Sequence, residues 1–587
     1  MRRVFERSFL LIIATSFLGA CSIALRAQTG RGSVTGTVMD VSHAVVPNAQ
    51  VTLINAAAGV ERKGSTSSAG IYYFGALPIG TYKLVIRKPG FQEWEGTFYL
   101  AVGQNAVANA VLVVGSTRQV VEVKGAASPL DTADGSVSDV MDSNEIRDMP
   151  LNGRQIGLLF NLVPGVESGA GGARVNGMKA GSLDITLDGV SLVDRFGGGI
   201  VRVQPGIETI QEFRVNTVGA DAKYAQPATV TMATRSGTNQ IHGGAYEYIR
   251  DNTVFGPTRL RTDPVTNFHV PELIRNEFGG YLGGPVVIPH VYNGRDKSFW
   301  FFDYEGLRDH ERFFPFFTSV PTEAMWNGDL SNAVDVNTLC TSTGVSCPAG
   351  YQYHPITIYD PTTTSPTSFQ RAPFPNNQIP GPFSKTAMVL KSLTALPTNN
   401  NNPYVAPNFT STYPQINRLN NYTGKWDQNI SDKDRLSVRY TRSMSLAAIE
   451  GGYFADPIDP SSGMGSSARN FANTNVGVEY TRSISPNWLN ELLVGVLRDP
   501  NHYGTLADFT DWDAQLGVPN PFSVTGWPTM YTEEASPLFF GWDSDNNHMQ
   551  HLTSESLDDN VTWIHGRHTI QFGFQGRMEQ NNVEELQ

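Results

Sequence analysis

Few stretches of this 587-residue sequence place reactive side chains at the spacing that a reaction centre needs. His269 and Glu272 in HVPE have the spacing of a zinc-binding pair, but no third ligand or general base follows at a recognisable distance. The stretch DSDNNH (543–548) begins like a calcium loop, yet His548 stands where such a loop needs glycine. No Ser-His-Asp arrangement or nucleotide-binding loop stands out. We therefore predict no catalytic residue, no metal site and no cofactor.

The N-terminus predicts export, and export bears on the state of the cysteines. The chain begins with MRR, continues with the apolar run FLLIIATSFL (9–18) and then has small residues up to Ala27. This pattern predicts a secretory signal peptide over residues 1–27, although LGAC at Cys21 leaves lipidation as an alternative. In an exported chain, Cys340 and Cys347 in CTSTGVSC are predicted to form a local disulfide, with free thiols as the alternative.

The composition favours β structure, and the charge limits the kinds of partner. Charged residues make up 17% of the chain, and Gly (57) and Pro (35) are abundant, which suits turn-rich β structure. The net charge of −12 argues against a nucleic-acid partner, which needs a basic surface. Beyond the signal peptide no apolar run reaches about 18 residues. Any membrane-spanning part must therefore be a β-barrel.

Residues 28–115 are predicted to form a small β-sandwich. Turn signals such as VPNA, SSAG and LPIG separate its candidate strands, which are expected at 32–40, 49–56, 70–78, 80–91 and 108–115. The order of these motifs resembles the carboxypeptidase regulatory-like domain, which implies a transthyretin-like, carbohydrate-binding-like fold. Four aromatic residues could stack on a sugar or could pack in the core: Tyr72, Tyr73, Phe91 and Trp94.

From residue 239 onward, long alternating strands recur. In SFWFFDYEGLR (298–308), Trp300, Phe302 and Tyr304 share one face, whereas Asp303 and Glu305 share the other with Phe299 and Phe301. The same alternation appears in RLSVRYTRS (435–443), NVGVEYTRS (475–483), LDDNVTWIHG (557–566) and HTIQFGFQG (568–576). Apolar residues facing lipid and polar residues facing a wet lumen are typical of an outer-membrane barrel. The edge of a soluble sandwich is the alternative.

Several phrases resemble TonB-dependent outer-membrane receptors of the Oar-like group. They include MPLNGR (149–154), IQEFRVNT (210–217), NEFGGYLGGPVVIP (276–289) and VPTEAMWNGDLS (320–331). The resemblance implies a mainly β protein with an N-terminal sandwich, a linker at 116–132, an α+β plug at 133–238 and an antiparallel barrel from 239 to 587. It also implies a location in the outer membrane, in contact with its lipid.

The resemblance further implies partners and a mechanism. A TonB-type periplasmic protein would pair with Val120, Val121, Glu122 and Val123 in VVEVKG, and an unidentified extracellular ligand (a siderophore, glycan or peptide) would bind the plug. Four plug residues are candidates to face that ligand: Arg174, Asn176, Asp188 and Arg195. A simple linker strand is the alternative for the pairing segment. A surface carbohydrate-binding or adhesion protein without transport is the alternative for the function.

The barrel is expected to be incomplete in this sequence. Plugged receptor barrels have about 22 strands. Between residues 239 and 587 only about ten convincing strands can be placed. We therefore expect the N-terminal part of a barrel. A smaller complete barrel of about ten to twelve strands, or strands supplied by a partner chain, are the alternatives.

Overall fold

The structure is a computed structural model. It describes residues 31–115, 119–120, 137–149, 156–160, 162–169, 172–179, 183–194, 205–218, 226, 228–252, 254, 272–312, 316–339, 352–411, 414–449, 467–505, 511–521, 523, 525, 530–531, 541–542, 548–566 and 568–585. The predicted signal peptide lies outside these residues, as do Val121, Glu122, Val123, Arg195, Cys340 and Cys347.

The N-terminal domain is the predicted β-sandwich. One sheet contains β1 (Gly32–Asp40), β4 (Ile71–Leu77), β7 (Asn105–Val107) and β8 (Ala110–Leu112). The other has the order β3 (Glu61–Ser65), β2 (Gln50–Asn55), β5 (Gly80–Arg87), β6 (Trp94–Leu100) and β9 (Gln119–Val120). The alternation of each strand turns one row of apolar side chains inward, and the core includes Val34, Val38, Val51, Leu53, Leu84 and Ile86. Strands β3, β6 and β7 were not predicted.

A central domain follows, built on a five-stranded sheet. Its order is β10 (Val137–Asp142), β15 (Ile210–Val218), β16 (Ala228–Thr234), β13 (Leu183–Leu187) and β14 (Val190–Ser191). The hairpin β11 (Val166–Gly169) and β12 (Gly172–Val175) accompanies it, with the short helices α2 (Ser143–Asp148), α3 (Ile156–Phe160) and η2 (Ile207–Thr209). Its core includes Ile146, Leu159, Val175, Ile185, Phe213 and Val230. These elements match an α+β domain.

One local prediction in this domain was wrong. The sequence SNEIRD (143–148) predicts a helix capped by Ser143, but the N-cap is Asp142. The Asp142 carboxylate accepts from the backbone N–H groups of Asn144 and Glu145, and the Glu145 carboxylate accepts from the Asp142 N–H. A carboxylate at this position satisfies two helix N–H groups and favours the helix dipole, so it outcompetes the neighbouring serine.

The largest element is a nine-stranded antiparallel sheet. In spatial and chain order its strands are β17 (His242–Asp251), β18 (Leu273–Pro285), β21 (Ser298–Arg312), β26 (Pro414–Asn429), β27 (Asp434–Ile449), β28 (Ser467–Ser485), β29 (Trp488–Thr505), β32 (His548–His565) and β33 (His568–Glu585). Within the described residues, β17 and β33 are the two edges of this sheet and do not pair with each other. The sheet is therefore open in the part of the chain that the structure describes.

The two faces of this sheet agree with the predicted alternation. Phe302 is 46% exposed, whereas its neighbours Phe301 and Asp303 are 2% and 0% exposed. Along β27, Tyr440 is exposed while Arg439 and Thr441 are buried. The outward row is apolar and aromatic, and the inward row is rich in polar side chains covered by the central domain.

The connections at the two ends of the sheet differ in length. At one end the strands are joined by the short segments 430–433, 486–487 and 566–567. At the other end, the long segments 313–413 and 506–547 contain elements of their own. These are β22 (Phe316–Thr318), α4 (Glu323–Trp326), β23 (Val334–Leu339), β24 (Tyr353–Pro355), η4 (Pro361–Thr363), η5 (Pro375–Asn377), α5 (Lys385–Leu393), β25 (Phe409–Ser411), α6 (Trp512–Leu516), β30 (Met530–Tyr531) and β31 (Gly541–Trp542). The small strands β19 (Val287–Ile288) and β20 (Tyr292–Asn293) lie in the connection 286–297.

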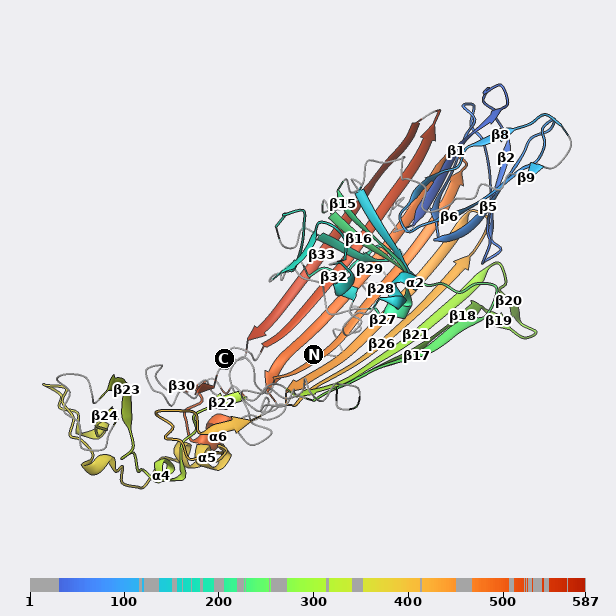
Figure 1. Cartoon of the computed structure of the whole chain (residues 1–587). Coiled ribbons are helices and arrows are strands. Elements are labelled where there is room, and N and C mark those ends of the chain that lie inside the picture. Colours follow the sequence, from blue (N-terminus) through green and yellow to red (C-terminus); the bar gives the residue numbers. More distant parts are fainter. Residues whose placement is uncertain are drawn as a thin grey trace.

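Figure 1 shows how these parts are arranged. The blue sandwich lies at the short-turn end of the large sheet, and the yellow lobe with α4, α5 and α6 lies at the opposite end. The central domain, with β15, β16 and α2, covers one face of the long strands. Contacts agree that the sandwich lies at the short-turn end. A cleft there is lined by Tyr73 and Gly75 of the sandwich together with Lys433 and Asn487 of the short turns.

Candidate functional site

The central domain is held against the large sheet by a buried ion cluster around Asp188. Asp188 follows β13 in a turn with φ 44°, a left-handed conformation that Asp tolerates better than most residues. Its Oδ2 lies 3.1 Å from Arg439 Nε and 3.4 Å from Lys425 Nζ. The Arg439 and Lys425 side chains are 2% and 9% exposed. This cluster joins the turn after β13 to two neighbouring strands of the large sheet, β26 and β27.

The environment of Asp188 keeps its carboxylate ionised. Thr234 donates to it through both its backbone N–H and its hydroxyl, at 3.0 and 2.6 Å. Burial raises the pKa of Asp188, but the charges of Lys425 and Arg439 and the bonds from Thr234 outweigh it, so the pKa lies below its ordinary value. Arg439 also donates to the Leu187 carbonyl oxygen at 3.0 Å, which fixes the same turn.

Two further polar contacts extend this interface along the sheet. Thr209 donates to the Asp303 carboxylate on β21 at 2.6 Å, and Ser236 donates to Asp427 on β26 at 2.7 Å. Lys425 donates to the Thr234 hydroxyl at 2.9 Å. Hydrogen bonds and ion pairs thus join the central domain to β21, β26 and β27 of the large sheet.

Apolar contacts join the same two parts, because Leu497 of β29 and Leu552 of β32 belong to the hydrophobic core of the central domain. Val190 is 2% exposed and lies over Gly477 of β28 and Gly495 of β29. A Cβ atom at Gly495 would come within 2.8 Å of a Val190 methyl group, so glycine is what allows this close approach. Val190 therefore packs directly onto the backbone of the wall.

The sandwich is attached to both other parts. Arg31 pairs with Glu479 of β28 at 2.6 Å, and both side chains are nearly buried, at 11% and 9% exposed. Glu212 of β15 accepts hydrogen bonds from the Val102 backbone N–H and from the Tyr99 hydroxyl of the sandwich. Burial raises the pKa of Glu212 to about 7, despite these two donors.

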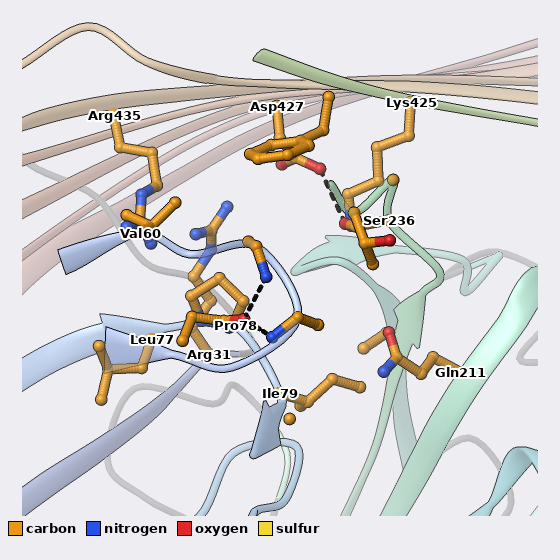
Figure 2. Close-up of a pocket in the computed structure, with 18 of the residues that line it drawn as sticks. Arg31, Val60, Leu77, Pro78, Ile79, Gln211, Ser236, Lys425, Asp427 and Arg435 are labelled. Atoms are coloured by element: carbon orange, nitrogen blue, oxygen red, sulfur yellow. Dashed lines mark hydrogen bonds between the residues drawn. The ribbon is translucent and has the colours of Figure 1, made fainter. Parts of the chain in front are cut away.

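A cavity of about 180 Å³ lies where the sandwich, the central domain and the large sheet meet. Figure 2 shows Arg435, Asp427 and Lys425 extending from the large sheet toward the sandwich loop that contains Leu77 and Pro78. The dashed line between Asp427 and Ser236 is the bond described above.

The sequence-predicted site residues lie in different places. Asp188 is in the ion cluster and lines the cavity. Arg174 is exposed, and Asn176 is an exposed turn residue with φ 49° whose amide donates to the Thr217 carbonyl oxygen at 3.0 Å. Val120 pairs in parallel with Glu95 at the edge of the sandwich. The structure therefore does not join Arg174 and Asn176 to the cluster around Asp188.

Some of the most connected residues were missed as site candidates. Arg439 and Glu479 had been placed on the polar face of their strands, but no role was predicted for them. Lys425, Arg31 and Glu212 were not considered. The available signal was a charged residue in the inward row of an alternating strand, where burial forces it to find a partner.

The proposed sugar-stacking aromatics are divided by the structure. Tyr72 and Trp94 are 2% and 4% exposed, and the Tyr72 hydroxyl donates to the Ala108 carbonyl oxygen. Packing in the core is confirmed for these two. Among the described residues, no group of three His, Cys, Asp or Glu side chains could hold a metal ion.

Comparison with known families identifies the chain. Residues 233–587 match the family described as the outer membrane beta barrel domain, so the chain belongs to this family. Residues 33–113 match the carboxypeptidase regulatory-like domain. The resemblance expected for the sandwich and for the barrel is confirmed, and the family places the protein in the outer membrane.

Several receptors of known structure are similar to part of this chain. The siderophore receptor PirA from Acinetobacter baumannii is 12% identical, with 76% of this chain and 48% of that chain covered and a TM-score of 0.38. A mutant of the ferric enterobactin receptor PfeA from Pseudomonas aeruginosa is 10% identical, with 77% and 50% covered and a TM-score of 0.38. BauA, the ferric preacinetobactin receptor from Acinetobacter baumannii, is 9% identical, with 76% and 58% covered and a TM-score of 0.35.

The chain spans about half the length of these solved receptors. None of the curated proteins compared with the chain matches it. In the part of the chain that the structure describes, no helix combines the length and apolar character needed to cross a membrane.

Proposed function

We propose that this protein is an outer-membrane receptor that passes a ligand through a plugged barrel, with energy from a TonB-type periplasmic partner. In this proposal, residues 133–238 are the plug and residues 239–587 contribute barrel strands. The segment 116–132 carries the pairing site for the partner. Arg174, Asn176, Asp188 and Arg195 remain proposed ligand-facing residues.

The observation that carries the proposal is the set of polar contacts between the central domain and the large sheet. The contacts of Asp188 with Lys425 and Arg439, and of Thr209 with Asp303, are of a kind that water can replace when the domain moves. The attraction within a buried ion pair is largely offset by the cost of removing both charges from water, so the pair adds little net stability. Such a pair can therefore orient the central domain without binding it tightly to the large sheet. A plug that must move needs an interface of this kind.

The different lengths of the strand connections at the two ends of the large sheet support an orientation of the protein in the membrane. Barrels of the outer membrane have short periplasmic turns and longer extracellular loops. The short segments 430–433 and 486–487 and the sandwich lie at the same end, which in this proposal faces the periplasm. The long segments 313–413 and 506–547 then face the outside, where a ligand arrives.

The position of β9 supports the coupling segment. Gln119 and Val120 form the edge strand of the sandwich sheet, beside β6. An edge strand presents unpaired backbone N–H and C=O groups, to which a partner can add a strand. In the proposal, Val120 to Val123 pair with the periplasmic domain of the partner in this way.

A proline scan tests this proposal. Val121→Pro removes a backbone donor and stiffens the segment, so we expect the affinity of the full chain in detergent micelles for a TonB periplasmic domain to fall at least about tenfold. Ala127→Pro lies just after the segment and is the matched control, with an expected change below about twofold. Calorimetry measures both. Equal binding by Val121→Pro and the unchanged chain would contradict the pairing assignment.

A disulfide lock tests the movement of the plug separately. Thr209→Cys with Asp303→Cys replaces a 2.6 Å hydrogen bond between the central domain and β21. We expect oxidation of this pair to stop ligand passage in cells that express the receptor, and a reductant to restore it. Single-cysteine variants are the controls. Full passage with the lock closed would show that the central domain does not have to leave its position.

A further inference from the structure

The cavity between the sandwich, the central domain and the large sheet has an excess of cations in its wall. Four cationic side chains line it, namely Arg31, Arg62, Lys425 and Arg435. Three carboxylates also line it: Asp188, Asp427 and Glu479. The charged side chains come from all three parts of the molecule, and sandwich residues such as Leu77 and Ile79 supply an apolar side.

The carboxylates in the wall are already engaged. Glu479 is paired with Arg31 at 2.6 Å, and Asp188 with Lys425 at 3.4 Å and with Arg439 outside the cavity. Asp427 accepts the Ser236 hydroxyl. Each carboxylate of the cavity therefore has a polar partner, and the charge of Asp427 also acts on Arg31.

Two of the arginines have no such partner. Arg62 donates to the Gly75 carbonyl oxygen at 2.6 Å, and Arg435 donates to the Asn429 side chain at 2.8 Å. Neither forms a salt bridge within the described residues. Arg31 keeps its Nη1 buried without a hydrogen-bond partner among those residues. A buried donor without an acceptor is costly, so the cavity wall holds donor capacity that a ligand can use.

The arginines also repel one another. Burial lowers the pKa of Arg62, and the charge of Arg31 lowers it further. Burial also lowers the pKa of Arg31, but the charges of Glu479 and Asp427 and the hydrogen bond to Glu479 outweigh it, so this pKa is raised. A negative charge between these guanidinium groups would relieve the repulsion and satisfy the open donors.

We propose that this cavity binds a small oxyanion, the phosphate or carboxylate group of a small molecule, held between Arg31, Arg62 and Arg435. Guanidinium groups bind such planar or tetrahedral oxyanions through paired N–H donors. The size agrees, because a cavity of about 150 Å³ is enough for a benzene ring. The apolar side formed by Leu77 and Ile79 accommodates a short carbon skeleton attached to the anion.

Binding at this place has a structural consequence. Arg62 belongs to the sandwich and Arg435 to β27, so the anion bridges two parts that also meet through Arg31 and Glu479. A ligand that binds the assembled state alone stabilises it in proportion to its concentration. The strength with which the sandwich is attached to the large sheet therefore rises with the concentration of the anion. Binding at this site does not depend on the proposed transport function.

Titration of the full chain in detergent micelles tests this inference. Inorganic phosphate and succinate are titrated separately by calorimetry, against chloride at matched ionic strength. We expect saturable binding of at least one of them, and Arg62→Gln and Arg435→Gln each to weaken it at least about tenfold. The matched control is Arg87→Gln, because Arg87 is 60% exposed and pairs with Glu93 away from the cavity. Binding of phosphate without succinate, or the reverse, identifies the source of the anion.

The midpoint of thermal unfolding, measured for the same proteins with and without the anion, gives a second test in case a variant is less stable. We expect the bound anion to raise the midpoint of the unchanged chain, and to raise that of Arg62→Gln much less. Without the anion, Arg62→Gln should be at least as stable as the unchanged chain, because it removes repulsion. Absence of saturable binding by both anions, or equal binding by Arg62→Gln and Arg87→Gln, would overturn the proposal.

Discussion

Replacement of Asp188 by Asn is a sharp test of how the central domain is held. The change removes one charge and retains the size of the side chain. Asn also tolerates the φ of 44° at this position, so the turn itself should persist. The amide oxygen can still accept a bond from Thr234. The effect is therefore assigned to the loss of charge opposite Lys425 and Arg439.

The expected magnitude follows from burial. Lys425 and Arg439 are 9% and 2% exposed, so they cannot recover their hydration when the carboxylate is lost. Removing one partner of a buried ion pair costs about 3–5 kcal/mol. Because the bonds from Thr234 are partly retained, we expect a value near the lower end, about 3 kcal/mol. This corresponds to roughly a hundredfold increase in the open population of the domain.

Hydrogen exchange of the β13 and β16 amides measures this population directly. We expect exchange about a hundredfold faster in Asp188→Asn at pH 7. The pKa of Asp188 is lowered in the folded chain, so its stabilisation is present above the unfolded value of about 3.9 and is lost as the pH falls through the folded value. The difference between the two proteins should therefore shrink at acidic pH.

The matched control is Asp139→Asn, an exposed carboxylate on β10 of the same sheet, for which we expect no measurable change. Unchanged exchange in Asp188→Asn would refute the reasoning. A difference that persisted at the acidic end of the titration would also contradict it, because the charge would then not be the cause.

Three other changes are expected to have defined effects. Glu212→Gln should stabilise the docking of the sandwich by about 3 kcal/mol above pH 7 and have little effect near pH 4. The reason is that the pKa of Glu212 is raised to about 7 in the folded chain, so ionisation of the buried carboxyl group is costly only as the pH rises. Urea unfolding at both pH values measures this. Gly237→Ala should destabilise the junction of the central domain and the barrel strands by about 1–3 kcal/mol, because the methyl group of the alanine would overlap the Trp300 carbonyl oxygen. An unchanged unfolding midpoint in this variant would show that the backbone adjusts instead. Phe302→Arg should cost about 2–4 kcal/mol on the lipid face, whereas Tyr292→Arg in the short connection should cost little; folding yields in lipid vesicles compare the two, and equal yields would argue against the assigned face.

Much of the architecture could be predicted from local patterns. Alternation has a period of two residues, so it assigns Phe302 and Asp303 to opposite faces without knowledge of the partner strands. The same rule placed Arg439 and Glu479 in the polar row. The sandwich strand β3 was missed because its sequence, ERKGS, is polar and carries no apolar alternation. The helix cap was misassigned by one residue because Asp142 and Ser143 are both good caps, and geometry decides between them.

The sequence by itself determined a mainly β protein with a sandwich followed by long alternating strands, because turn residues and a two-residue period are local signals. The apolar run after a basic start, also a local signal, predicts export. The tertiary structure alone decided which buried charges meet. Asp188 pairs with Lys425 and Arg439, and Arg31 with Glu479, across hundreds of residues. A local pattern states that a buried charge needs a partner, but the partner depends on which strands lie side by side, and long-range pairing leaves no mark on the neighbouring residues.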